Sequence, residues 1–343
     1  MFISPQIIST VRDRILNAAT DVLNQNRADL WWRDVAQEEF GQNETEIYTF
    51  AIQAAKLQDM GIKGQGVAFD SRQYLKNSVT HHYFREGFAL TDGELSDLDS
   101  NRIQAATDWV RDITYDGLYN PQRLLAQGVL LAGTKAYDGL SYFHTAHYTN
   151  GANAVNGTFG NNWVGTGYDI SSGVTLDLAI QNLAAARQKV KVLKDPSGKP
   201  RNLRVKAVLA PAPLYPRLVQ VIQAQYAPGA AATGGGTQDV AMLSSALGFG
   251  KPLEAVELGA DFSGATDDGT AFTGNDKAYY MVCEYAGPHA PFVLSNREPF
   301  RLFENSMNSS AELARINQWE WIYSGRQALM PMHPYLLHRF SPT

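Results

Sequence analysis

Apolar residues recur at a spacing of three or four along several stretches of the chain, which predicts amphipathic helices. Three of these stretches are residues 5–26, 174–193 and 214–226. A fourth, residues 94–133, has the same spacing but contains Pro121. Because proline disfavours the helical conformation in the residue before it, this stretch predicts either one long interrupted helix or two helices in sequence.

Shorter runs that are rich in β-branched and aromatic residues predict strands. We expect these strands at residues 46–54, 203–209, 279–283, 291–294 and 318–323. They mix with the helices without a regular strand–helix–strand alternation. The pattern therefore predicts an α+β protein rather than a parallel, doubly wound sheet.

Residues 56–90 follow neither pattern, because glycines cluster near their start and the later apolar residues are scattered among polar ones. This favours a long two-stranded excursion with a flexible tip and little core of its own. Since a projecting hairpin is only marginally stable by itself, we expect the excursion to lie on another surface. Trp31 and Trp32 stand in a polar setting, so the N-terminal arm should also lie against something, either the chain's own body or a neighbour.

Composition and charge exclude several classes of protein. The chain has 343 residues, of which 44% are apolar and 18% charged, and this is typical of a soluble protein of about two domains. A net charge of −5 and the lack of a strongly basic segment argue against sequence-specific nucleic-acid binding. The single cysteine, Cys283, lies in an apolar run, which indicates a buried thiol and a reducing cytoplasm. No signal peptide or membrane-spanning stretch is expected.

The chain carries no phosphate loop, no dinucleotide-binding fingerprint and no nucleophile elbow. Its best candidate for chemistry is the pair His144 and His147, with Asp138 as a third metal ligand. Turn residues flank this group, which favours a hydrogen-bonded structural role, and Asp267–Gly269 likewise indicates a turn rather than a calcium loop. We therefore predict no catalytic, cofactor-binding or metal-binding residue and no enzyme. A metal-dependent hydrolase built on the His144 group is the weakest alternative.

The segment Tyr137–His147, with the sequence YDGLSYFHTAH, resembles the "YDG-x-x-FF-x-x-x-H" segment of the Mu-like major head subunits of tailed bacteriophages. Three other segments are similar to that family and occur in the same order. Arg85–Glu94 looks like the acidic start of its spine helix, Leu203–Leu214 like its strand–proline–helix passage, and Trp321–Arg326 like its closing strand. The resemblance spans residues 45–330, by the order of the segments more than by identity.

The resemblance implies the HK97-like phage capsid fold, which is an α+β fold. Its parts would be an N-terminal arm at 1–55, an extended loop at 56–92, a peripheral domain with a long spine helix at 93–174, an axial domain at 175–317, and strands that return to the peripheral domain at 318–343. The order of elements expected from the residues alone matches this order.

The resemblance also implies a function, that of a major capsid protein. Copies would assemble as pentamers and hexamers into an icosahedral shell that encloses phage double-stranded DNA without reading its sequence. The implied partners are further copies of the chain, a portal protein, a scaffolding protein and decoration proteins, with no membrane and no cofactor. The implied location is the virion capsid, after assembly in the host bacterial cytoplasm. The initiator-like Met1 favours a separate scaffolding protein over a cleaved scaffold segment. An encapsulin-like nanocompartment or a gene-transfer particle is the alternative with the same fold.

Contacts between subunits are expected in the excursion and in the arm. The candidate residues are Ile62, Lys63, Gln65, Arg72, Tyr74, Trp31 and Trp32. Lys63 and Lys76 also stand where a crosslink between subunits could form, as it does in some relatives. No reactive partner for either lysine is evident in the sequence.

Overall fold

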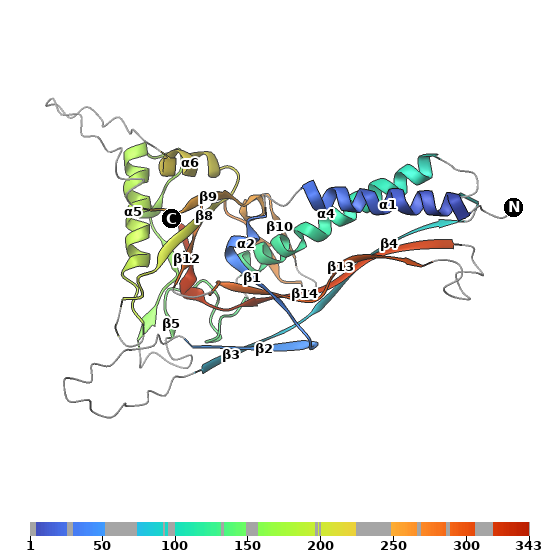
Figure 1. Ribbon diagram of the computed structural model, residues 1–343. Helices are drawn as coiled ribbons and strands as arrows, with labels where there is room; N and C mark the ends of the chain where they lie inside the picture. The colour runs from blue at the N-terminus through green and yellow to red at the C-terminus, as the bar shows by residue number, and fades with distance from the viewer. Residues whose placement is uncertain are drawn as a thin grey trace, which may run out of the picture.

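The computed structural model describes residues 5–25, 30–51, 74–91, 93–94, 100–131, 134–148, 157–195, 198, 200–223, 248–265, 269–285, 289–305 and 318–342. It has two parts, which we call the body and the limb (Figure 1). The body is built on a five-stranded sheet, and the limb is an elongated arrangement of long helices on a four-stranded sheet. This mixture of helices and strands confirms the predicted α+β class.

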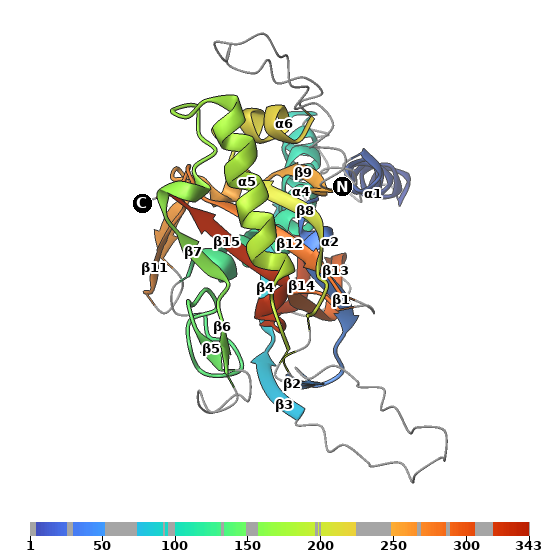
Figure 2. The same ribbon diagram turned by 90° about the vertical axis from the view of Figure 1, so that its left-hand side faces the viewer.

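The body's sheet contains, in spatial order, β7 (Asn162–Val164), β15 (Leu337–Ser341), β12 (Tyr279–Glu284), β8 (Arg204–Ala210) and β9 (Lys251–Glu254). Helix α5 (Leu176–Lys191) lies across one face, next to α6 (Tyr215–Gln223) (Figure 2). Side chains alternate along β12, so that Tyr279 and Met281 join the core beneath α5 while Tyr280 joins a second core. The central strands of the sheet are therefore covered on both faces.

The limb's sheet contains, in spatial order, β1 (Ala36–Phe40), β13 (Phe292–Asn305), β14 (Gln318–Pro331) and β4 (His82–Thr91). Helix α4 (Ser100–Leu130) runs along one face, and α1 (Pro5–Gln25) packs against α4 (Figure 1). Ile15 of α1, Val110 of α4 and Trp321 of β14 meet in one core cluster. The N-terminal arm, the long helix and the C-terminal strands therefore depend on one another for burial.

A hairpin lies on the side of the limb's sheet opposite α4 (Figure 1). Its strands are β2 (Thr45–Ala51) and β3 (Tyr74–Thr80), which are antiparallel and place Ala51 opposite Tyr74. Tyr48, Leu75 and Val79 of the hairpin pack on an apolar cluster formed by Val293, Met330 and Met332. The residues between Ala51 and Tyr74, which include residues 56–73 of the predicted excursion, lie outside the described residues. The end of the predicted excursion was wrong, because residues 82–90 belong to β4 and pair with β14 in the limb's sheet.

The predicted helices are confirmed where the structure describes them, since α1, α5 and α6 lie within the expected stretches. Residues 224–226 lie outside the described residues. The single helix is the correct alternative for residues 100–130, because α4 continues through Pro121; residues 95–99, 132 and 133 lie outside the described residues. An internal proline removes one hydrogen bond from the helix and costs roughly 3 kcal/mol. Tertiary packing offsets this cost, since the neighbouring Asn120 is buried and donates to Gln327 of β14 at 2.9 Å.

The predicted strands are found, but several extend further than their sequence pattern. β13 and β14 each continue for 14 residues, and β1, β7, β9 and β15 were not predicted. The remaining short elements are β5 (His147–Tyr148), β6 (Thr158–Phe159), η2 (Thr166–Tyr168), η3 (Val256–Leu258), β10 (Ser263–Ala265), β11 (Ala271–Thr273) and η4 (Pro334–Leu336). Asp267 and Asp268 lie outside the described residues. Within the described part of the chain, none of the helices has the length and apolarity that crossing a membrane requires.

Candidate functional site

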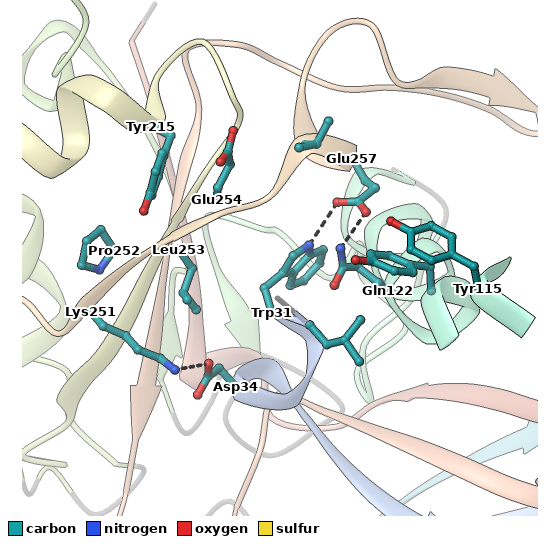
Figure 3. Close-up of a pocket in the computed structure, with 13 residues that line it drawn as sticks. Trp31, Asp34, Tyr115, Gln122, Tyr215, Lys251, Pro252, Leu253, Glu254 and Glu257 are labelled. Carbon is teal, nitrogen blue, oxygen red and sulfur yellow. Dashed lines mark hydrogen bonds and ion pairs between the residues drawn. The ribbon is translucent and has the colours of Figure 1, made fainter. Parts of the chain in front are cut away.

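Trp31 joins the N-terminal arm to the long helix through a shared carboxylate. The indole N–H of Trp31 donates to one oxygen of Glu257 at 3.0 Å, and the amide of Gln122 on α4 donates to the other oxygen at 2.7 Å (Figure 3). Glu257 belongs to η3, directly after the body's edge strand β9. One carboxylate therefore ties together three segments that are far apart in the sequence.

Asp34 provides a second tie between the arm and the body. It lies in the short helix α2 (Trp32–Val35), and its carboxylate lies 2.6 Å from the ammonium of Lys251 and 3.1 Å from that of Lys206. Burial by itself would raise the pKa of Asp34, but the hydrogen bonds and charges of the two lysines outweigh it and hold the pKa below its usual value. Asp34 is therefore ionised at neutral pH and holds α2 against β8 and β9.

These two ties form the floor of a groove, which we call the arm groove. It has a volume of about 580 Å³ and is open on one side. The arm, α4, α6, β9 and η3 contribute its walls, and Tyr115 and Tyr215 reach into it from opposite sides (Figure 3). The groove is thus lined by the arm, the long helix and the body together.

The base of the hairpin is latched to the limb by His81. The Nε2 atom of His81 lies 2.9 Å from the hydroxyl of Ser295, and its Nδ1 lies 3.1 Å from the backbone oxygen of Glu44. The side-chain amide of Asn77 donates to the backbone oxygen of Pro331 at 3.0 Å. These contacts hold the described part of the hairpin at its root.

The candidate contact residues divide into three groups. Ile62, Lys63, Gln65 and Arg72 lie outside the described residues, as do the N-terminal residues of the excursion. Tyr74 begins β3, and Lys76 is exposed on the same strand. Trp31 and Trp32 are only 2% and 6% exposed and belong to the core beneath the body's sheet. Of the two surfaces expected to cover the tryptophans, the chain's own body is the one observed. This burial leaves the two side chains little surface for contact with a neighbouring copy.

The histidine group proposed for metal binding is a hydrogen-bonded knot. The Nδ1 atom of His147 lies 2.9 Å from a carboxylate oxygen of Asp138 and its Nε2 lies 3.0 Å from the backbone oxygen of Tyr142, so both ring nitrogens are already engaged by protein atoms. His144 accepts the backbone N–H of Ala146 at 3.1 Å. Among the described residues, no three His, Cys, Asp or Glu side chains are grouped to hold a metal ion. The favoured structural role therefore agrees with the geometry.

The sequence did not reveal the residues that make these ties. Asp34, Glu257, His81 and Ser295 occur in no motif, and their partners lie between 37 and 226 residues away in the chain. Only the clustered tryptophans signalled that the arm is anchored. Cys283 is buried as expected, and burial raises the pKa of its thiol, which makes it unreactive.

The likeness of this chain to known proteins is one of structure. No protein-family model and no curated protein matches the sequence. A chain of the procapsid of bacteriophage JBD30 is similar with a TM-score of 0.50 and 12% identity, over 99% of this chain and 76% of the other. The capsid of cyanophage P-SCSP1u gives 0.52 and 10% over 91% and 88%, and the mature capsid of bacteriophage PhiM1 gives 0.50 and 11% over 91% and 87%. The Mu-like subtype stays a prediction. Because three capsid structures share the arrangement of nearly the whole chain, this protein has the HK97-like fold of phage capsid subunits.

Proposed function

We propose that this chain is a major capsid protein, whose copies assemble as pentamers and hexamers into an icosahedral shell around phage double-stranded DNA. The role is structural rather than enzymatic. A shared fold does not by itself establish a shared function, so the proposal also depends on how this chain presents its surface.

The hairpin β2–β3 is the observation that carries the proposal. It is a two-stranded ribbon, which is marginally stable without a further surface to cover it. Within the described residues, His81, Asn77 and the small apolar cluster hold one face of it against the limb. Ile47 on β2 is 65% exposed, and Phe40, shortly before it on β1, is 74% exposed. Large exposed apolar side chains on and next to the ribbon indicate a surface that another molecule covers.

The hairpin also fits the geometry of a closed shell. A contact in which the hairpin of one copy lies on a different surface of the next is heterologous, and such contacts close into rings when the rotation between copies allows it. The doubly covered sheet of the body supplies a rigid tile.

The proposal extends to partners and location. Further copies of the chain are the main partner, with a portal protein, a scaffolding protein and decoration proteins as the others. The candidate contacts Ile62, Lys63, Gln65, Arg72 and Tyr74 belong to this contact between copies. The shell would form in the host bacterial cytoplasm and become the capsid of the virion.

Shortening the excursion tests the proposal. Because Ala51 and Tyr74 are directly paired, an Asn-Gly turn can replace residues 52–73 and close the hairpin without disturbing its root. Deleting residues 62–82 would be less informative, since it removes β3 and its contact with Met330. We expect the shortened chain to stay folded by circular dichroism but to form no stable shells by electron microscopy, with or without its scaffolding partner.

The unaltered chain is the control, and it should form closed shells under the same conditions. Unaltered chain that stays monomeric in sedimentation under all assembly conditions would remove the basis for the proposal. A normal yield of shells from the shortened chain would instead exclude the excursion from assembly. Analysis of the shell contents separates DNA from enclosed enzyme, and so separates a capsid from a nanocompartment.

A further inference from the structure

Charge is distributed unevenly along the arm groove, and folding of the chain does not require this distribution. At one end, Asp34 is neutralised by Lys206 and Lys251. At the other end, Glu254 and Glu257 form no ion pair within the described part of the chain, and Glu257 accepts only the neutral N–H groups of the arm and α4. The negative charge of the groove is therefore concentrated where it is lined by η3 and the tyrosines.

Gln122 gives an independent indication of what this end of the groove lacks. The residue is only 4% exposed, and its side-chain oxygen is buried and has no hydrogen-bond partner among the described residues. Its orientation is fixed, because exchanging the amide atoms would turn that oxygen toward the carboxylate of Glu257. A buried acceptor without a donor costs free energy. Gln122 also lines the groove, so a ligand that reaches this side chain could supply the missing N–H donor.

Aromatic rings surround the same end of the groove. Tyr115 and Tyr119 of α4 stack with their ring centres 4.3 Å apart, and Tyr215 of α6 faces them across the groove (Figure 3). Tyr115 is 44% exposed, so part of its ring is open to a ligand. The faces of such rings attract cations, guanidinium groups in particular.

Carboxylates, an unsatisfied acceptor and tyrosine rings together match the guanidinium group, which is planar, cationic and rich in N–H donors. We propose that the arm groove binds an extended, arginine-bearing segment of a different protein, which thereby holds the arm, α4 and the body together. This binding goes beyond the proposed shell function, since it is a property of the single chain.

The experiment measures binding of a labelled nonapeptide that carries three arginines separated by glycine and alanine. Its matched control has citrulline, the neutral analogue, in place of each arginine. Fluorescence anisotropy with the full chain should show binding of the arginine peptide, weakened by added salt, and much weaker binding of the citrulline peptide. The variant Glu254→Gln should weaken binding several-fold and Glu254→Gln/Glu257→Gln roughly tenfold.

Further variants separate the groove from the general charge of the protein. Tyr115→Leu should weaken binding roughly threefold, whereas Tyr115→Phe, which keeps the ring, should not. Glu44→Gln removes an exposed carboxylate far from the groove and should change nothing. Glu254 is exposed and bonds to no described side chain, so its variant remains informative even if Glu257→Gln loosens the arm.

Three outcomes overturn the proposal. The first is equal binding of the two peptides, and the second is arginine-peptide binding that Glu254→Gln leaves unchanged. The third is self-association of the chain that Glu254→Gln abolishes, because a second copy would then occupy the groove. Shell formation is scored separately by electron microscopy, so failure here leaves the proposed function untouched.

Discussion

The imidazole of His147 lies 2.9 Å from the carboxylate of Asp138, and neither side chain is exposed to solvent. The same carboxylate accepts the backbone N–H groups of Tyr148 and Leu140. Although burial opposes ionisation, the hydrogen bond and charge of His147 lower the pKa of Asp138. The segment that most resembles the Mu-like head subunits is therefore a buried polar knot that fixes the start of β5.

Breaking this knot should destabilise the chain strongly. In Asp138→Asn a neutral amide replaces the carboxylate that faces the ring of His147. Removing one partner of a buried charged pair typically costs about 3–5 kcal/mol of stability. Urea unfolding of the unassembled chain measures this loss. Asp108→Asn, which removes an exposed pair with Arg111, is the matched control and should cost less than about 1 kcal/mol. Equal losses in the two variants would show that the knot contributes nothing special.

The latch at the root of the hairpin should depend on the absence of a side chain at Gly41. A Cβ atom there would lie 2.7 Å from the hydroxyl of Ser295 and 2.9 Å from the ring of His81. Gly41→Ala should therefore break the hydrogen bond between His81 and Ser295 and lower the free energy of unfolding by about 1–3 kcal/mol. Amide hydrogen exchange should be faster in β2 and β3 than in the unaltered chain.

Gly87→Ala is the matched control for this variant, because it adds a methyl group in the adjoining strand β4. The new Cβ would lie 3.7 Å from its nearest atom, the backbone oxygen of Trp321, which is an ordinary contact. It should leave exchange in the hairpin unchanged. Faster exchange in both variants would mean that the latch is not the cause.

Local sequence pattern was sufficient for elements that bury one regular face. The helix α5 shows this, since successive turns carry Ile180, Leu183 and Ala186 into the core. Lys189 and Lys191 stand in its last turn, as the helix dipole favours. The strand β8 was predicted from its continuous apolar run, which is buried on both faces, with Val208 in one core and Leu209 in the other. For such elements the periodicity records the burial directly.

Pattern failed where a partner distant in sequence decides the structure. The strand β1 contains two glutamates and an exposed phenylalanine, and it is a strand because it pairs in parallel with β13, more than 250 residues later. Similarly, β13 and β14 extend far beyond their apolar starts because each supplies the other's backbone hydrogen bonds. The carboxylate of Glu257 could not be assigned for the same reason.

Helix α4 gives a prediction in which packing should outweigh helix propensity. Gly117 lies inside α4, where alanine would normally stabilise a helix by about 1 kcal/mol. A Cβ atom there would lie 2.5 Å from the ring and hydroxyl of Tyr323 on β14, so Gly117→Ala should destabilise the chain by about 1–3 kcal/mol. In a Tyr323→Ala background the same change should become stabilising. A double-mutant cycle in urea measures the sign change, and the same sign in both backgrounds would contradict the contact.

Two buried histidines should make the chain less stable as the pH falls below neutral. Burial lowers the pKa of His338 to about 4, helped by the nearby His147, and lowers that of His333 to about 3, helped by His289 and Arg201. In the unfolded chain both titrate near 6.5. The stabilisation is therefore fully present above pH ~6.5. It declines as the pH falls toward the pKa values of the folded chain, because in this range the unfolded chain binds protons at these histidines and the folded chain does not.

The free energy of unfolding should fall by about 1.4 kcal/mol per pH unit for each histidine. This fall occurs between pH ~6 and ~4.5, before Asp34 and Asp138 become protonated. His338 donates from Nε2 to the backbone oxygen of Tyr335 at 2.9 Å. His338→Gln can keep that donor but cannot titrate, so it should roughly halve the slope of unfolding free energy against pH. His82→Gln, at an exposed position, should leave the slope unchanged. Urea unfolding at a series of pH values provides the slopes, and an unaltered slope in His338→Gln would show that this buried ring does not control the acid sensitivity.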